Sequence, residues 1–139
     1  MQITLKNLTD TNNLARKIAR QVKAGQVWAF FGDLGTGKTT LIQMIAKELG
    51  VKEIVTSPTF VIEKRYKTHE GLQIIHIDCY RFQSSNDAQS IGHSEFDNNK
   101  IYFIEWAEKI TNLLPNEAIK VFLTHNRNVR EIKIEGINL

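Results

Sequence analysis

A glycine-rich loop between an apolar strand and a helix constrains the fold of this chain more than any other segment. Val27–Phe31 is an unbroken apolar run, which is typical of a central strand covered on both faces. The next eight residues, Gly32 to Thr39, match the pattern G-x-x-x-x-G-K-[ST] at every fixed position. Apolar residues then mark one face of a helix from Leu41 to Leu49, which is expected to end at Gly50. This order of elements predicts a phosphate-binding loop.

The residue types in the loop suit a chain of phosphates. Its glycines let the backbone curl so that N–H groups converge on phosphate oxygens, and the N-terminus of the next helix adds positive potential. Lys38 is expected to reach the β- and γ-phosphates, and the Thr39 hydroxyl to bind Mg²⁺. The alternative is a glycine-rich turn that ends in Lys-Thr by chance. Such a turn would have no need to lie between a strand and a helix, so the flanking elements favour phosphate binding. The predicted nucleotide-binding residues are Gly32, Leu34, Gly35, Thr36, Gly37, Lys38, Thr39 and Thr40.

Length and composition limit what surrounds the loop. The 139 residues, 42% of them hydrophobic, match one ordinary globular domain, so we expect a single phosphate-loop domain over residues 1–139. The longest apolar run is far shorter than the roughly 20 residues that span a bilayer, so no membrane association is expected. Met1–Lys6 lacks the basic region and apolar stretch of a signal peptide. These features predict a cytoplasmic protein, and a single cysteine, Cys79, excludes an internal disulfide.

Helix and strand patterns alternate along the rest of the chain. Apolar residues recur every four positions between Thr9 and Gly25, which predicts a helix capped by Thr9 or Asp10 and ended by Gly25. Strands are expected at residues 60–66, 72–78, 101–104, 118–124 and 129–134, with hairpins at the first and last pairs. Gln83–Lys100 is polar and predicts a short helix plus loop. The expected class is α/β: a three-layer P-loop NTPase fold, whose mostly parallel sheet carries antiparallel hairpin additions.

Two acidic residues end predicted strands. Asp78 follows the apolar stretch of one strand, and Glu105 follows Ile101–Ile104 in another. A phosphate-loop hydrolase needs such an acid to hold Mg²⁺ or its water, and α/β sheets bind ligands at the carboxyl ends of their strands. Either residue could instead be a solvated carboxylate at a strand end. The spacing alone does not decide which of the two is the direct metal ligand.

Other functions of phosphate-loop proteins leave two alternatives. A guanine reader is disfavoured, because the nearest match to N-K-x-D has Tyr102 in place of the aspartate. ATP is therefore favoured by exclusion. A small-molecule or nucleoside kinase is one alternative, although the sequence has no arginine-rich lid segment. The other is a basic nucleic-acid-binding module, suggested by the net charge of +3 and the pI of about 9.0.

Four motifs occur along the chain in a fixed order. The phosphate loop is followed by Ser57-Pro58-Thr59-Phe60, by His76-Ile77-Asp78-Cys79-Tyr80-Arg81 and by Ile104-Glu105-Trp106. Many families share the loop, whereas the combination of all four motifs is narrow. In their order and spacing, over nearly the whole chain, these motifs resemble the bacterial TsaE (YjeE-like) family, the ATPases of tRNA threonylcarbamoyladenosine synthesis.

The resemblance implies a role for each motif. It implies that Lys38 holds the phosphates of ATP, that Thr39 and Glu105 bind Mg²⁺, and that Asp78 belongs to the catalytic site. It also implies that residues 57–60 form a switch-like loop near the γ-phosphate. Within that loop, Thr59 is a catalytic candidate because its hydroxyl can be offered to the metal or to the attacking water; chemistry alone would equally allow an ordinary turn hydroxyl.

The resemblance also implies partners. In that family the TsaB and TsaD proteins transfer threonylcarbamoyl to the position-37 adenosine of tRNA, and this component binds them and hydrolyses ATP. Contact with tRNA would then be indirect, through the complex. No arginine finger can be assigned from the sequence, so we expect slow hydrolysis by the chain alone and faster hydrolysis with its partners.

For three other residues within these motifs, structural roles are favoured. His76, on an apolar strand, is more typical of a hydrogen-bonded core histidine than of a catalytic base. Cys79 is more typical of a small buried hydrophobe than of a nucleophile. Trp106 is most simply a core aromatic residue, although its place beside Glu105 also allows it to pack near the nucleotide.

Overall fold

Four parallel strands form the centre of the computed structural model, which describes residues 1–58, 63–83, 87 and 96–139. They are β2 (Val27–Phe31), β4 (Gln73–Asp78), β5 (Lys100–Glu105) and β6 (Ile119–Asn126). Both faces of β2 are covered, since all five of its residues are buried. The carboxyl ends of these strands therefore meet at one edge of the sheet, directly beside the phosphate loop.

Antiparallel strands extend the sheet on both sides. β3 (Glu63–Lys67) pairs with β4, β7 (Val129–Glu135) pairs with β6, and β1 (Gln2–Leu5) pairs with β7. The full order is β1-β7-β6-β2-β5-β4-β3. The parallel pairings occupy the middle and the antiparallel pairings the edges, which confirms the predicted α/β class with hairpin additions.

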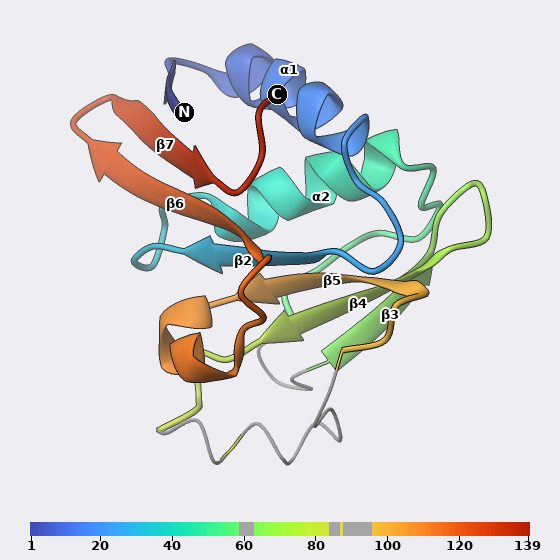
Figure 1. The fold of residues 1–139 in the computed structure, drawn as a ribbon. Helices are drawn as coiled ribbons and strands as arrows, with labels where there is room; N and C mark the ends of the chain where they lie inside the picture. The colour runs from blue at the N-terminus through green and yellow to red at the C-terminus, as the bar shows by residue number, and fades with distance from the viewer. Residues whose placement is uncertain (59–62, 84–86, 88–95) are drawn as a thin grey trace.

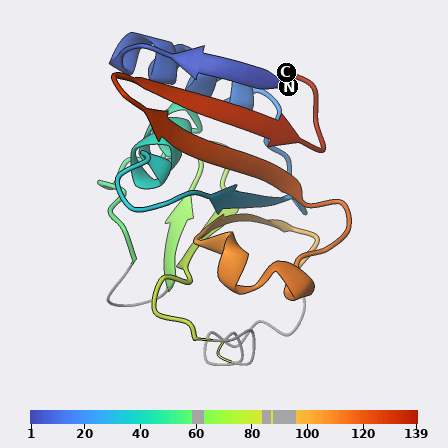
Figure 2. The same ribbon diagram turned by 90° about the vertical axis from the view of Figure 1, so that its left-hand side faces the viewer.

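Helices and loops cover the two faces of the sheet unequally. The helices α1 (Leu8–Ala19) and α2 (Lys38–Glu48) lie on one face and pack against each other (Figure 1). The short 3₁₀ helices η2 (Ala107–Lys109) and η3 (Thr111–Leu113) cover the other face (Figure 2). Alternate residues of β2 enter two separate apolar cores, one under each layer. The result is the three-layer arrangement that the sequence predicts.

The first helix differs from its sequence-based prediction at both ends. Its cap is Asn7, not Thr9 or Asp10: the Asn7 side chain accepts a hydrogen bond from the Asp10 backbone N–H at 2.9 Å. The helix ends at Ala19, well before Gly25. Gly25 has φ +89° and donates its N–H to Lys100 O, so it starts the entry into the sheet and does not end the helix.

Several strand predictions also need adjustment. The N-terminal strand β1 was not predicted, because it is short and its alternate residues face solvent. The hairpin strand expected at 60–66 runs from Glu63 to Lys67, and residues 59–62 lie outside the described part. Most of Gln83–Lys100, where a short helix was expected, also lies outside it. Within the described residues, neither α-helix combines the length and the apolar character needed to cross a membrane.

Candidate functional site

The loop from Gly32 to Thr39 connects β2 to α2, as the sequence predicts. Gly32, Gly35 and Gly37 all have positive φ, between +78° and +149°. At Gly32 an added Cβ would lie 2.5 Å from the Leu123 carbonyl oxygen, so no other residue fits there without moving β6. The glycines of the motif therefore set the path of the loop.

Lys38 is the first residue of α2 and points back over the loop. Its side chain is buried, and its ammonium donates hydrogen bonds to Gly32 O and, at 2.9 Å, to Asp33 O. The Trp106 ring lies 4.2 Å from the ammonium, at cation–π distance. Burial lowers the pKa of the Lys38 ammonium, an effect opposed by the carboxylates of Glu108, Glu105, Asp78 and Asp33. The loop thus holds the Lys38 ammonium close to these four carboxylates.

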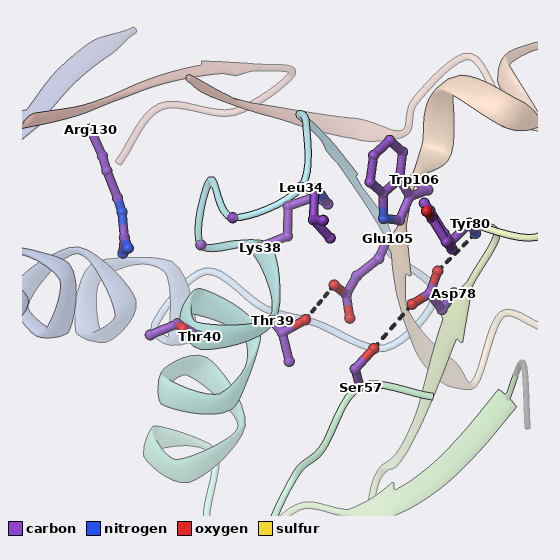
Figure 3. A pocket seen from close by; sticks show the side chains of 12 residues that line it. Leu34, Lys38, Thr39, Thr40, Ser57, Asp78, Tyr80, Glu105, Trp106 and Arg130 are labelled. Atoms are coloured by element: carbon purple, nitrogen blue, oxygen red, sulfur yellow. Dashed lines mark hydrogen bonds between the residues drawn. The ribbon is translucent and has the colours of Figure 1, made fainter. Parts of the chain in front are cut away.

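The two predicted acids lie side by side at the carboxyl edge of the sheet. Asp78 of β4 and Glu105 of β5 are partners in the strand register, and both side chains are buried. Glu105 Oε1 accepts a hydrogen bond from the Thr39 hydroxyl at 2.6 Å, which links β5 to the start of α2 (Figure 3). Asp78 accepts from the Ser57 hydroxyl at 3.1 Å and from the Tyr80 N–H at 2.8 Å. The motifs that are separate in the sequence are therefore joined at one site.

His76 lies in the core and contacts the site through Glu105. It is fully buried, as expected of a core histidine, and its Nε2 lies 2.6 Å from Glu105 Oε2. Both carboxylate oxygens of Glu105 are thus engaged, one by Thr39 and one by His76. The other ring nitrogen, Nδ1, has no hydrogen-bond partner among the described residues. The sequence predicted a hydrogen-bonded histidine, but the partner is a residue of the site.

The oxygen-rich surroundings of Glu105 fit a magnesium ion. Mg²⁺ prefers hydroxyl, carboxylate and phosphate oxygens, and it takes few protein ligands beside the phosphates of its nucleotide. Thr39 and Glu105 supply one hydroxyl and one carboxylate. In the described residues, no three His, Cys, Asp or Glu side chains are grouped to hold a metal ion by themselves. The donor set therefore fits an ion completed by phosphates.

Cys79 is inert beside these acids. It is buried, and burial raises the pKa of its thiol to about 12, with the Asp78 and Glu108 carboxylates adding to the shift. The thiol is therefore protonated at neutral pH, and the prediction of a small buried hydrophobe is confirmed.

Trp106 lies in the wall of the site and also packs, half-buried, against the second apolar core. It has φ +55° at the start of η2, and its ring lies over Lys38 and 5.0 Å from the ring of Tyr80. It therefore combines the two predicted placements, contact with the core and a position beside the phosphate loop. Glu108, two residues further along, accepts a hydrogen bond from the Gly32 N–H at 3.2 Å. That contact was not predicted, because nothing in the sequence relates η2 to the loop.

A pocket of about 360 Å³ connects these residues (Figure 3). Most predicted nucleotide-binding residues line it, whereas Gly32 and Thr36 are not part of the lining. The Thr36 hydroxyl donates a hydrogen bond to Asp33 O within the loop. Thr59 lies outside the described residues. Arg130 of β7 also lines the pocket and was not predicted. The described lining consists of Leu34, Gly35, Gly37, Lys38, Thr39, Thr40, Ser57, Asp78, Tyr80, Glu105, Trp106 and Arg130.

Helix α2 also holds the segment that leads to Ser57. One turn after Thr39, the Gln43 amide donates a hydrogen bond to Val55 O at 2.5 Å. Lys64 of β3 holds the same segment through the Thr56 hydroxyl. The segment before the predicted switch loop is therefore attached both to α2 and to the edge of the sheet.

A parallel sheet, a glycine loop leading into a helix, and paired acids at the strand ends define a phosphate-loop protein of the nucleotide hydrolase kind. Comparisons with known proteins agree. The family model described as "Threonylcarbamoyl adenosine biosynthesis protein TsaE" matches residues 5–132. This chain belongs to the TsaE family.

Curated relatives and a solved structure resemble the chain over most of its length. The protein named tRNA threonylcarbamoyladenosine biosynthesis protein TsaE from Aquifex aeolicus is 38% identical over 135 residues, which cover 96% of this chain and 94% of that protein. Its namesake from Rickettsia typhi is 35% identical, with the same coverage. The crystal structure of Bacillus subtilis YdiB superposes with a TM-score of 0.76 at 30% identity, covering 96% of this chain and 83% of that one.

Proposed function

We propose that this chain binds and hydrolyses ATP with Mg²⁺, and that hydrolysis supports threonylcarbamoyladenosine formation at the position-37 adenosine of tRNA. The pathway is proposed from the names of its relatives, and the chemistry from the site. The observation that carries the proposal is the 2.6 Å hydrogen bond between Thr39 and Glu105 directly after the phosphate loop. It unites the hydroxyl and the carboxylate that a Mg²⁺–nucleotide complex requires.

The phosphates of ATP would bind over the loop. Backbone N–H groups from Gly35 to Thr40 would hold the phosphate oxygens, and Lys38 would leave the loop carbonyls to reach the β- and γ-phosphates. Thr39 and Glu105 would hold Mg²⁺, which supplies positive charge to the reacting phosphates when bound. His76, bonded to the second oxygen of Glu105, would fix the direction of that carboxylate.

Asp78 would act on the water side of the reaction. Its hydrogen bond with Ser57 links the carboxyl end of β4 to the predicted switch loop, where the catalytic candidate Thr59 follows two residues later. Asp78 and Thr59 would together orient the attacking water, while the loop and Lys38 stabilise charge on the γ-phosphate. Catalysis by this chain would then depend mainly on positioning and electrostatics.

Partner proteins complete the proposed function. Arg130 is the only arginine among the described lining residues, and it lies on the side of the loop away from Glu105 (Figure 3). Among the described residues, none would therefore bring an arginine to the γ-phosphate end. We propose that TsaB and TsaD bind this single-domain protein in the cytoplasm and accelerate its hydrolysis. Equal hydrolysis rates with and without these partners would contradict this part of the proposal.

Reconstitution tests the function directly. Purified TsaB, TsaD, tRNA, ATP and a preformed, activated threonylcarbamoyl donor should yield modified tRNA repeatedly only when this chain is added. Omitting it, or replacing ATP with a non-hydrolysable analogue, should stop repeated turnover. Labelled ATP should release phosphate to water, whereas a labelled acceptor would indicate a kinase. Equal yields of modified tRNA without this chain would refute the proposal.

A further inference from the structure

Two buried polar atoms next to the acid pair have no hydrogen-bond partner among the described residues. They are Nδ1 of His76 on β4 and the side-chain hydroxyl of Tyr66 on β3. His76 is fully buried, and Tyr66 is 7% exposed. Leaving a buried polar group without a partner is costly, so folded proteins satisfy nearly all such groups with protein atoms or with ordered water. Each of these two atoms therefore requires a partner.

The two residues are neighbours on one face of the sheet. β3 and β4 pair antiparallel with Tyr66 opposite Ile74, so His76, two positions further along β4, is the diagonal neighbour of Tyr66. Residues two apart on a strand project to the same face. The ring centroids of Tyr66 and His76 are 6.5 Å apart, with the ring planes at 41°. The rings thus lie next to each other without a direct hydrogen bond between their polar atoms.

The contact between His76 and Glu105 determines which kind of partner Nδ1 needs. Nε2 lies 2.6 Å from a carboxylate oxygen, which only accepts hydrogen bonds, so Nε2 carries the proton of the neutral imidazole. Nδ1 then presents a lone pair and requires a donor. The Tyr66 hydroxyl has a proton to donate. One water molecule satisfies both atoms, because it can accept from the hydroxyl and donate to the lone pair.

We infer that a buried water molecule bridges the Tyr66 hydroxyl and His76 Nδ1, and that Tyr66 is a positioning residue for Glu105. The inference rests on the proposed function where it assigns Glu105 to Mg²⁺. Tyr66 donates to the water, the water donates to His76, and His76 donates to Glu105. Hydrogen bonds that point the same way strengthen one another, so the water makes the His76 N–H a better donor. Glu105 is thereby held in one direction before a metal ion binds.

The water bridge gives the edge strand β3 a part in the site. No residue of β3 is among the described residues that line the pocket. A change at the Tyr66 hydroxyl therefore reaches Glu105 through His76 and not by contact with the nucleotide. This dependence separates a positioning role from direct binding of ATP, and it can be measured.

A crystal structure of the full chain tests the water directly. At a resolution that shows ordered water, one water molecule should lie within hydrogen-bond distance of both Tyr66 Oη and His76 Nδ1. Electron density without a water at that place, or with either atom bonded to another group, would overturn the inference. This test needs neither nucleotide nor Mg²⁺.

Tyr66→Phe tests the bridge in solution, with Tyr102→Phe as its matched control. Each variant loses one phenol oxygen and keeps its ring, but the Tyr102 hydroxyl lies in the other core, where it accepts from the Asp97 N–H at 3.0 Å. In ring-nitrogen NMR of the chain with isotope-labelled histidine, the His76 Nδ1 signal should move toward that of an unbonded nitrogen in Tyr66→Phe, because the water loses a partner. It should stay in place in Tyr102→Phe. An unmoved Nδ1 signal in Tyr66→Phe would overturn the inference.

Turnover measurements test the positioning role. Tyr66→Phe should lower ATP turnover about threefold and raise the Mg²⁺ requirement, because Glu105 is held less firmly. The same change made in His76→Leu should have no further effect, since Tyr66 acts through His76. An equal loss in both backgrounds would show a packing effect and would overturn the positioning role. If the folded wild type does not hydrolyse ATP, the proposed function is wrong, and the crystallographic and NMR tests still decide whether the water bridge exists.

Discussion

The two ends of the nucleotide pocket are built differently. At the acid end, which comprises Thr39, Ser57, His76, Asp78 and Glu105, the carboxylates are buried and already hydrogen-bonded. At the outer end, formed by Gly37, Thr40 and Arg130, a guanidinium has no partner among the described residues and borders open space. The groups proposed for chemistry are thus ordered before any ligand binds, whereas the outer end presents a guanidinium that forms no hydrogen bond or ion pair with the described residues.

This contrast predicts different kinetic effects at the two ends. Changes at the acid end should lower turnover and alter its dependence on Mg²⁺, while changes at the outer end should mainly weaken binding. The following variants test the acid end, beginning with the loop lysine that faces the β- and γ-phosphates.

Lys38→Ala should have the largest effect. Without its ammonium the loop loses the charge that faces the β- and γ-phosphates, and we expect ATP hydrolysis to fall roughly 1,000-fold or more. The fold should persist, because among the described residues the Lys38 ammonium donates hydrogen bonds only to carbonyls of its own loop and otherwise contacts the Trp106 ring at the pocket wall. Phosphate release and circular dichroism measure the two properties. Lys47→Ala, on the exposed end of the same helix, is the control; a fully active Lys38→Ala would contradict the assignment of the loop.

Glu105→Gln should have the next largest effect on ATP turnover. The amide keeps the size of the side chain but removes the negative charge, so turnover should fall about 100-fold and require more Mg²⁺. Binding of ATP measured without Mg²⁺ should change little. Asp78→Asn is the matched variant one strand away, and it should lower turnover without shifting the Mg²⁺ requirement. If Asp78→Asn shifts that requirement and Glu105→Gln does not, the metal role belongs to Asp78.

His76→Leu should reduce turnover by about tenfold through the loss of its hydrogen bond to Glu105. His76→Gln offers an amide N–H toward the same carboxylate oxygen and should recover part of the loss. The rescue distinguishes a positioning role from packing alone, since a packing defect would affect both variants and would lower the unfolding temperature equally. Mg²⁺ titrations of turnover should show the same order of variants.

The smallest expected effect concerns the pKa of the buried Cys79 thiol, which depends on how far water is excluded from the acid end. The Cys79 thiol ionises near pH 9 in the unfolded chain and, because burial raises its pKa, only at about pH 12 in the folded protein. The folded state therefore retains its proton longer, and stability falls as pH rises above 9. At pH 9.5 this costs about 0.8 kcal/mol, which Cys79→Ala should not show. Urea unfolding of the wild type and of Cys79→Ala at pH 7.5 and 9.5 measures the difference. If both proteins lose the same free energy of unfolding between these pH values, the Cys79 thiol is accessible to water.

The acid end could be predicted from sequence, because its parts follow local patterns. Apolar runs place β2 and β5 as buried strands, and parallel strands bring their last residues to one edge, so Glu105 was expected beside the phosphate loop. Residues 72–78 were predicted as part of a hairpin, and Asp78 was expected in the site from the resemblance; the parallel pairing of β4 with β5 is what brings it there. The partner of His76 was not expected, because a hydrogen bond between strands depends on their register, which the sequence does not contain.

The outer end could not be predicted for the same kind of reason. Arg130 reaches Gly37 because β7 folds back beside β6, and β6 lies beside β2. Nothing in the local pattern around residue 130 signals that neighbour, and a single arginine in a polar hairpin resembles a surface residue. Likewise, Glu108 reaches Gly32 only because η2 follows β5 at the edge of the sheet. Contacts that depend on strand order have no local signature.

The attachment of α2 at two points has a mechanical consequence. The helix starts at the site with Lys38 and Thr39, and one turn later Gln43 holds Val55, just before Ser57. A rigid helix moves all of its hydrogen bonds together, so a small shift of its first turn on phosphate release would pull the segment at 55–57 by a similar amount. Helix α2 would then transmit the state of the nucleotide, as a displacement of this segment, to the surface beside β3.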